Sequence, residues 1–346
     1  MSTVSETPAA PFVPELGIVP SWLEEQTAML KRAHRAGRVP HALLIHEAPG
    51  AGGEWLALFS AQLVLCQHPE RAPCGACVAC RRVAALQHPD LSWVRPQGTS
   101  QQIRIEQVRD LCAELALTSH AAGGYKVGIL APADALNRFA ANALLKTLEE
   151  PPQRTLLMLV ASQPSRLPPT ILSRCQRLRV RAPSREQALG WLLRTRGAGE
   201  WNAALDLLGE APMLAVQADA AEVAAIGAES RRALEELLVG EADPVAVSER
   251  WARSQWPLRL LCFENWLTEK LRRAGNASGF LTELRDGPYL SERGTFLNIR
   301  ELFRLIDEVR ELRATLDAPL NRGLAVEALL RRLAPAKRAR NGVREG

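Results

Sequence analysis

The stretch ALLIHEAPGAGGEWLALFSAQLVL (residues 42–65) decides the fold of this 346-residue chain. Its apolar start, Ala42–Ile45, predicts a buried strand, its middle is rich in glycine, and Trp55–Leu65 predicts a helix. Strand, glycine-rich loop and helix in this order are typical of a phosphate-binding P-loop, in which backbone N–H groups surround the phosphates. For the loop taken alone, a plain glycine-rich turn is the alternative.

The loop departs from the P-loop pattern G-x-x-x-x-G-K-[ST]. Of its fixed residues only the second glycine, Gly52, is present, and Gly50 lies within the loop. Glu47 stands at the first glycine, Gly53 at the lysine and Glu54 at the hydroxyl that binds Mg²⁺. A carboxylate about 4 Å from a phosphate charge costs on the order of 4 kcal/mol at an effective dielectric near 20. The sequence therefore predicts a loop that does not bind ATP.

The acidic residues that hold Mg²⁺ at the end of a strand in P-loop ATPases are also missing. The apolar run Val127–Leu130 is followed by Ala131 and Pro132, and the first carboxylate after it is Asp134. We expect Asp134 to be a surface or helix-capping residue rather than a metal ligand.

Further apolar runs predict strands that are buried on both faces of a parallel sheet. They are Leu91–Val94, Val127–Leu130, Leu156–Val160 and Leu178–Val180. Apolar residues at helical spacing lie between them, as in Ile105–Leu115 and Ala140–Leu148. This alternation predicts an α/β fold with a doubly wound parallel sheet.

After residue 181 the sequence predicts helices only. The expected helices are Ser184–Arg194, Trp201–Leu208, Glu222–Leu238, Val245–Leu271, Ile299–Leu316 and Leu324–Leu333. Ser184 and Gln187 form a predicted capping box. The stretch Ala274–Phe280 is expected to be a loop, and the basic residues 335–346 a frayed tail.

Four cysteines gather just behind the helix of the opening stretch: Cys66, Cys74, Cys77 and Cys80. Two residues separate each of the last three, and four thiolates suit a tetrahedral, structural zinc ion. The alternatives are an iron–sulfur centre, free thiols, or a site in which His68 or His88 replaces one sulfur.

Composition places the chain among ordinary globular proteins. The 43 Lys and Arg against 38 Asp and Glu give a net charge of +5, which permits contact with nucleic acid without requiring it. No apolar run approaches the roughly 18 residues of a membrane span, and Met1–Leu16 lacks the features of a signal peptide. We therefore expect a cytoplasmic protein with reduced cysteines, in which Cys112, Cys175 and Cys262 are core thiols.

The chain resembles the delta-prime subunits of the bacterial DNA polymerase III clamp loader, which are AAA+-type proteins. The matching segments are Arg38–Leu44, the degenerate glycine loop, the four cysteines, Asn142–Pro152, Leu172–Cys175 and Leu320–Leu324. The segment NALLKTLEEPP (residues 142–152) and the motif Ser173-Arg174-Cys175 are the most specific. The resemblance is dense in the α/β part and sparse in the helical part.

The resemblance implies an AAA+-like domain (1–181) with a zinc module (66–80), a helical lid (182–220), a helical collar (221–335) and a basic tail (336–346). In the family, five such subunits form a heteropentamer through their collars, open the sliding clamp and set it on primer-template DNA. The implied partners are gamma/tau-type ATPase subunits and a delta-type subunit. The clamp and the DNA are reached indirectly, and no membrane is involved.

The resemblance also implies a division of labour around ATP. This chain hydrolyses nothing, and Arg174, placed by Ser173 and Cys175, reaches ATP that the neighbouring subunit holds. Active members carry a lid arginine in a Gly-x-x-Arg motif, and here the matching residue after Gly209 is Pro212. An arginine is suited to bind phosphate oxygens, because its guanidinium is planar and permanently charged.

Two other functions compete with this interpretation. One is a gamma-type ATPase with an atypical loop, against which Gly53 and Ala131 argue. The other is a stand-alone zinc-dependent nucleic-acid-binding protein. Its cysteine loop carries only Arg71 and the pair Arg81-Arg82 nearby, without interleaved aromatic residues for base stacking.

Overall fold

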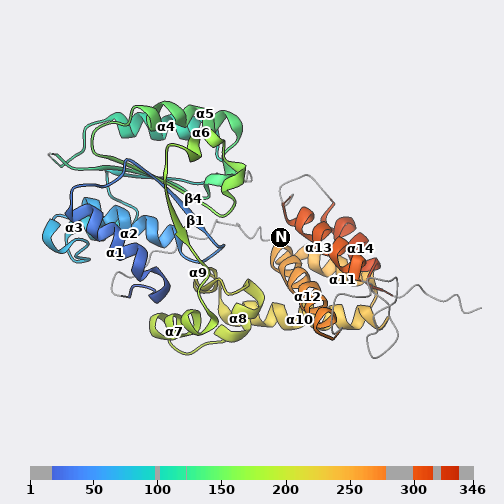
Figure 1. The fold of residues 1–346 in the computed structure, drawn as a ribbon. Coiled ribbons are helices and arrows are strands. Elements are labelled where there is room, and N and C mark those ends of the chain that lie inside the picture. The colour runs from blue at the N-terminus through green and yellow to red at the C-terminus, as the bar shows by residue number, and fades with distance from the viewer. Residues whose placement is uncertain (1–17, 98–101, 122, 278–298, 315–320, 335–346) are drawn as a thin grey trace, which may run out of the picture. The chain divides into compact units, whose positions relative to one another are not determined.

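The computed structural model describes residues 18–97, 102–121, 123–277, 299–314 and 321–334 (Figure 1). They form two compact units. The first comprises the chain up to Leu205 together with Glu210–Asp219, and the second comprises Asp206–Gly209 and the chain from Ala220 onward. The expected basic tail and Met1–Leu16 lie outside the described residues. The division into lid and collar at residue 220 stays a prediction.

A parallel five-stranded sheet forms the centre of the first unit, in the order β2-β3-β4-β1-β5. The strands are β1 (Ala42–Glu47), β2 (Leu91–Val94), β3 (Lys126–Leu130), β4 (Thr155–Ala161) and β5 (Gln176–Val180). All five predicted strands are confirmed, with ends within two residues of the prediction. β1 and β5 run side by side, with Leu43 opposite Gln176 and Glu47 opposite Val180.

Helices cover both faces of this sheet, which confirms the doubly wound α/β class (Figure 1). One face carries α4 (Ile105–Ala116) and α5 (Arg138–Glu149), and the other α1 (Glu24–Arg35), α2 (Gly53–Leu65) and α3 (Val78–Ala84). Under α4 and α5 the apolar side chains of both helices pack on those of the strands. On the other side α2 is buried along most of its length, because its apolar residues face all round the helix.

Short helices complete the first unit. They are α6 (Pro169–Leu172), α7 (Arg185–Arg196), α8 (Trp201–Leu208), whose last turn belongs to the second unit, and α9 (Pro212–Gln217). Single turns of 3₁₀-helix occur at Ser21–Leu23, Pro69–Arg71, Ala133–Ala135 and Pro164–Arg166. The predicted capping box is confirmed, because Ser184 Oγ accepts from the Gln187 N–H and Gln187 Oε1 from the Ser184 N–H.

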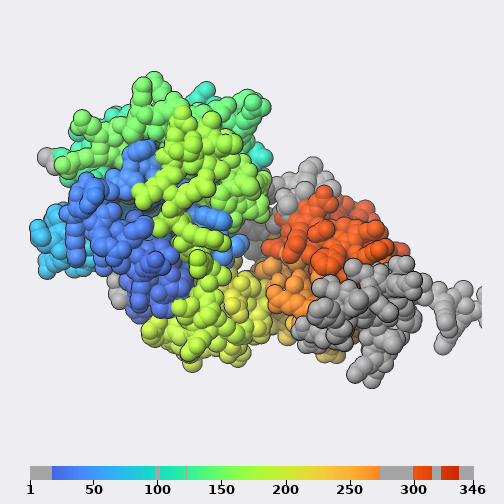
Figure 2. All heavy atoms as spheres, viewed as in Figure 1, coloured from blue at the N-terminus to red at the C-terminus, as the bar shows by residue number. Residues whose placement is uncertain are grey.

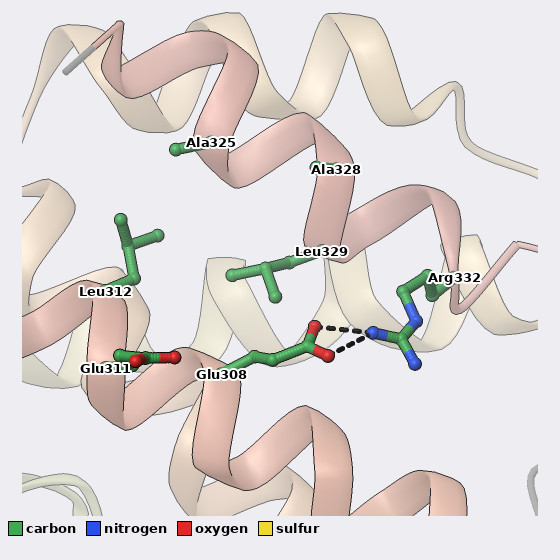
Figure 3. Close-up of a pocket in the computed structure, with 7 residues that line it drawn as sticks. All are labelled: Glu308, Glu311, Leu312, Ala325, Ala328, Leu329 and Arg332. Atoms are coloured by element: carbon green, nitrogen blue, oxygen red, sulfur yellow. Dashed lines mark hydrogen bonds and ion pairs between the residues drawn. The ribbon is translucent and has the colours of Figure 1, made fainter.

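The second unit is helical throughout its described part. It contains α10 (Ala220–Leu238), α11 (Pro244–Arg253), α12 (Trp256–Ala277), α13 (Ile299–Ala314) and α14 (Arg322–Arg331). Trp251, Phe263 and Trp266 are the largest fully buried side chains of its core. Ion pairs join the helices at their surface, and Figure 3 shows Glu308 of α13 bound to Arg332 after α14.

Two predictions for this unit were wrong. The single helix expected over Val245–Leu271 is α11 and α12, which meet at Gln255 with a φ of +51°. Pro257 explains the break, because proline lacks the N–H that a continuous helix needs and clashes with the preceding turn. The expected loop Ala274–Phe280 continues α12 as far as Ala277, and the rest of it lies outside the described residues. Among the described helices, none combines the length and apolar character that crossing a membrane requires.

Candidate functional site: a blocked phosphate loop, four cysteines and Arg174

The glycine loop has the context of a P-loop. It leaves β1 after Glu47 and enters α2 at Gly53, and Gly52 adopts a positive φ of 108° just before the helix. The backbone N–H groups at the start of α2 therefore point into the loop, where a P-loop protein binds phosphate. The strand–loop–helix prediction is confirmed.

A side chain of the protein itself accepts hydrogen bonds from these N–H groups. Glu47 Oε2 accepts hydrogen bonds from the N–H of Gly52 at 3.1 Å and of Gly53 at 2.6 Å. The carboxylate thus takes the position and the charge of a phosphate oxygen at the helix N-terminus.

The glycine at the lysine position makes room for that carboxylate. A Cβ on Gly53 would lie 2.7 Å from Glu47 Cδ and 2.8 Å from Val160 Cγ1. Burial raises the pKa of Glu47 to about 7, although the N–H groups of Gly53 and Gly52 lower it. The departures at positions 47 and 53 are thus coupled in the fold, and a carboxyl group of the loop itself fills the place of the bound phosphate.

The second carboxylate of the loop has a partner that sequence reasoning missed. Arg95 Nη2 lies 2.6 Å from Glu54 Oε2, and the Arg95 guanidinium stacks on Trp93 at 4.6 Å from the ring centroid. Burial raises the pKa of Glu54, and the charge of Arg95 opposes that shift. A cation is therefore present near the loop, but it is bound to Glu54. The only sequence signal for it is a basic residue directly after strand β2.

Segments far from the loop in sequence cover the opening of the pocket beside it. Gly50 O accepts from the N–H of Met213 in α9 at 3.1 Å, and a Cβ on Gly50 would lie 2.6 Å from Ala211 Cβ. The Trp22 indole N–H donates to Ala51 O at 2.7 Å. The remaining cavity has a volume of about 150 Å³, below the roughly 300–1,000 Å³ of typical ligand sites.

Two neighbouring predictions concern single residues. Pro212, at the place of the lid arginine, is buried at the first turn of α9 and brings no charge to the loop. The expectation that Asp134 lies on the surface or caps a helix is wrong, because Asp134 is buried in the 3₁₀ turn Ala133–Ala135 that follows β3. Asp134 Oδ2 accepts from Ser162 Oγ and from the Gln163 N–H, both at 2.9 Å, and so links the ends of β3 and β4.

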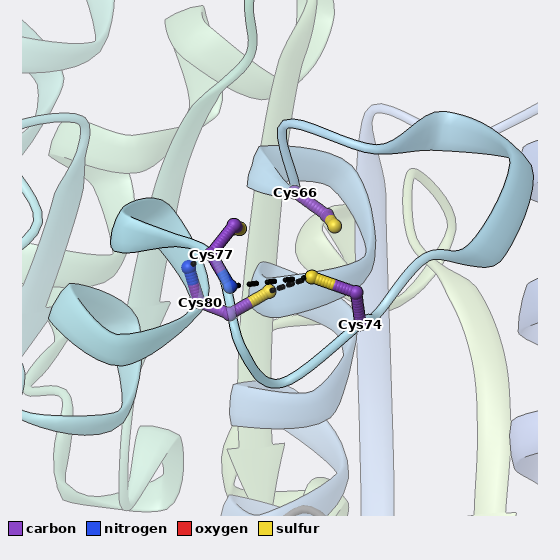
Figure 4. Close-up of side chains that lie close together, drawn as sticks. All are labelled: Cys66, Cys74, Cys77 and Cys80. Atoms are coloured by element: carbon purple, nitrogen blue, oxygen red, sulfur yellow. Dashed lines mark hydrogen bonds between the residues drawn. The ribbon is translucent and has the colours of Figure 1, made fainter.

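The four cysteines converge at the C-terminus of α2 and the start of α3 (Figure 4). Their Sγ atoms all lie within 4.8 Å of one another. A tetrahedral zinc ion with bonds of about 2.3 Å would separate its sulfurs by about 3.8 Å, so only a small contraction is needed. The backbone N–H of His68, Cys77 and Cys80 each approach a sulfur of the set at 3.4 Å, which favours thiolates.

The donor set therefore fits a metal ion. The N–H of Cys77 lowers the pKa of Cys74 to about 6, whereas burial raises that of Cys80. No histidine belongs to the cluster among the described residues, and His88 Nδ1 instead accepts from the Asp90 N–H. α3 and the loop before it lie at the outer edge of the first unit (Figure 2).

Cysteines outside this set behave as predicted. Cys175 and Cys262 are buried, and Cys112 is partly buried against the sheet core. Burial raises the pKa of both Cys175 and Cys262 to about 11. They are therefore neutral core thiols.

Arg174 lies between α6 and β5, at the opposite end of the sheet from the glycine loop. Because Gln176 pairs with Leu43 at the start of β1, the length of β1 separates the arginine from Gly53. At about 3.3 Å per residue, this is roughly 15 Å or more. The arginine therefore cannot reach the loop of its own chain.

Comparison with known proteins covers most of the chain. Residues 22–184 match the family model for "DNA polymerase III, delta subunit". The DNA polymerase III subunit delta' of Pseudomonas aeruginosa is 34% identical over 298 residues, which cover 84% of this chain and 90% of that protein. The corresponding Escherichia coli subunit is 32% identical over 323 residues, 90% of this chain and 94% of that protein.

A second likeness, of similar sequence identity, is confined to one part of the chain. The DNA polymerase III subunit tau of Escherichia coli is 35% identical over 152 residues, which are 44% of this chain and 23% of that protein. The delta' subunits of Pseudomonas aeruginosa and Escherichia coli, in contrast, match over nearly their full length. The chain therefore belongs to the family of DNA polymerase III delta-prime subunits.

Proposed function

We propose that this chain is a clamp-loader subunit of the DNA polymerase III holoenzyme that binds no ATP itself and supplies Arg174 to ATP held by a neighbouring subunit. The observation that carries the first half is the Glu47 carboxylate on the N–H groups of Gly52 and Gly53. A triphosphate would have to displace this carboxylate, pass α9 and bind beside Glu54 without a lysine. Each step is unfavourable, and together they leave a subunit without ATPase activity of its own.

The second half is supported by where Arg174 lies. It is partly exposed, it is anchored by a buried Cys175, and the sheet holds it away from its own glycine loop. A permanent charge in a planar fork, presented at a surface, suits the phosphate oxygens of a ligand on another chain. The arginine would then stabilise the charge that develops during hydrolysis.

The partners follow from the family. We infer a heteropentamer with gamma/tau-type ATPases and a delta-type subunit, joined through the helices of the second unit, which loads the sliding clamp onto primer-template DNA. The four cysteines would hold one structural zinc ion, which ties the end of α2 to α3.

The gamma-type ATPase is the competing function, and binding measurements separate the two. We expect the isolated chain with bound metal to show no ATP binding by calorimetry up to millimolar ATP with Mg²⁺. Micromolar affinity would overturn the first half of the proposal.

Arg174→Ala tests the second half in the reconstituted loader. We expect assembly to remain intact and hydrolysis at the neighbouring site to slow by about 10³-fold, the lower end of what such fingers contribute in GTPases. Arg177→Ala is the matched control, because Arg177 is exposed on the adjacent strand β5. Equal turnover of wild type and Arg174→Ala would contradict the role in trans.

A further inference from the structure

The residues beside Arg174 are fixed by the fold. Cys175 is buried in the core under α5, and Ser173 Oγ donates to Thr170 O of α6 at 3.1 Å. The backbone at residue 174 therefore has little freedom, and only the arginine side chain can vary its direction. What holds that side chain decides where its charge is presented.

Three acceptors of the same chain hold the Arg174 guanidinium. Nη1 donates to Thr170 O at 2.9 Å and to Ser173 Oγ at 3.3 Å. Nη2 forms an ion pair with Glu149 Oε1 at 2.7 Å. An arginine carries five N–H donors, and Nη1 uses its two on Thr170 O and Ser173 Oγ. The Nε–H and Nη2 donors lie side by side and can form a fork to two oxygens of an anion.

The backbone of Glu149 is held by a helix that packs on the sheet core. It is the last residue of α5, whose preceding residues Leu144 and Leu148 are buried in the sheet core. About half of the Glu149 side chain is exposed, and 35% of that of Arg174. Glu150 carries the same charge one residue later, and no ion pair joins it to Arg174 in the described structure. α5 thus presents one carboxylate to the arginine and a second that can serve as a control.

We propose that Glu149 is a positioning residue for Arg174. It contributes the only charged anchor among the three groups and holds Nη2 in place by an ion pair, so that Nε–H and Nη2 are presented together to phosphate oxygens. The flexible side chain is then ordered before the ligand arrives, and the ligand does not bear that entropic cost. The inference rests on the proposed role of Arg174 in trans and adds the residue that prepares it.

A carboxylate beside an arginine could instead act as a competitor that phosphate must displace. The two roles predict opposite effects of Glu149→Gln. A glutamine keeps an oxygen that accepts from Nη2 but loses the charge, so a positioning role is largely preserved while a competing charge is removed. Glu149→Ala removes both the acceptor and the charge.

The contact itself is tested in the isolated chain, without reference to ATP. The rate at which phenylglyoxal modifies Arg174, followed by peptide mass spectrometry, reports how freely the guanidinium moves. We expect Glu149→Ala to raise this rate about two- to fivefold, as fits the loss of an exposed ion pair. Glu150→Ala should leave it unchanged. No change with Glu149→Ala would overturn the inference whatever Arg174 does in the complex.

The consequence is tested by ATP turnover in the reconstituted loader. We expect Glu149→Ala to lower kcat about two- to fivefold with KM unchanged, Glu149→Gln to restore most of the loss, and Glu150→Ala to match wild type. In an Arg174→Ala background Glu149→Ala should have no further effect. A higher turnover with Glu149→Gln would overturn positioning in favour of competition. If Arg174→Ala itself leaves turnover unchanged while the labelling result holds, the role in trans fails and the contact stands.

Discussion

At the residue scale, burial makes the charge of Glu47 unfavourable in the folded chain. Burial raises its pKa from about 4.5 to about 7, so between these pH values the folded chain binds more protons than the unfolded chain. Its contribution to stability is therefore greatest below pH 4.5, falls as the pH rises through this window and levels off above pH 7. At about 1.36 kcal/mol per pKa unit the fall amounts to about 3 kcal/mol.

Glu47→Gln should remove this pH dependence, because the amide does not titrate. We expect the free energy of unfolding of wild type, minus that of Glu47→Gln, to drop by about 3 kcal/mol from pH 4.5 to pH 7.5 in urea titrations. Glu106→Gln, an exposed carboxylate on α4, is the control for general charge effects. A difference that stays flat with pH would show that Glu47 is ionised and solvated in the native state.

The loop residues show what sequence can and cannot reveal at this scale. The missing lysine and the two added carboxylates are visible in residues 47–54, because the P-loop motif is local. That Glu47 folds back on Gly52 and Gly53, and that Arg95 pairs with Glu54, depends on the strand order and on the depth of the pocket. Neither has a local pattern, and the misplacement of Asp134 has the same origin.

At the scale of elements, the entry of β1 into α2 depends on a glycine. We expect Gly53→Ala to destabilise the protein by about 1–3 kcal/mol, because its Cβ would overlap Glu47 Cδ and Val160 Cγ1. In a Glu47→Ala background the cost should fall, although the contact with Val160 remains, so a double-mutant cycle in chemical denaturation should show coupling between the two sites.

Gly190→Ala provides the matched control for this substitution. Gly190 also lies in a helix, α7, but no atom lies within 4 Å of the position its Cβ would take. Alanine there should stabilise by about 0.5–1 kcal/mol, the usual gain inside a helix. If Gly53→Ala behaved like Gly190→Ala, glycine at position 53 would not be needed to make room for the Glu47 carboxylate.

Elements were the part of the structure most open to prediction. Continuous apolar runs of this length, such as Leu156–Val160, suit strands of a covered parallel sheet, and all five strands are where the sequence predicts them. The helices of the second unit were found from their spacing, but a helix ending at Arg253 and another starting at Trp256 share one periodic pattern. Only Pro257 marks the boundary, and proline is also tolerated in the first turn of a helix.

At the scale of the whole molecule, the buried cluster under α4 and α5 and the buried cluster of the helical second unit share no member, and the four cysteines belong to the first unit. We expect about one zinc ion per chain. Because binding of a metal to the folded state adds directly to its stability, the ion should stabilise the first unit and leave the second unaffected. Calorimetry should then show two transitions, of which a chelator lowers only one.

Tryptophans allow the two transitions to be assigned. Trp251, Trp256 and Trp266 belong to the second unit, and the other five tryptophans belong to the first unit. Substitution of the three tryptophans of the second unit by phenylalanine therefore isolates the fluorescence of the metal-bearing first unit. Cys77→Ser should lose the metal and reproduce the effect of the chelator, whereas Cys112→Ser, which removes a thiol of α4 outside the cluster, should keep both metal and transition. A metal-free protein with unchanged melting, or a chelator that shifts both transitions equally, would contradict a structural zinc site confined to the first unit. The end of α2 would then be held to α3 by packing and by the hydrogen bond from Gln62 Nε2 to Cys80 O.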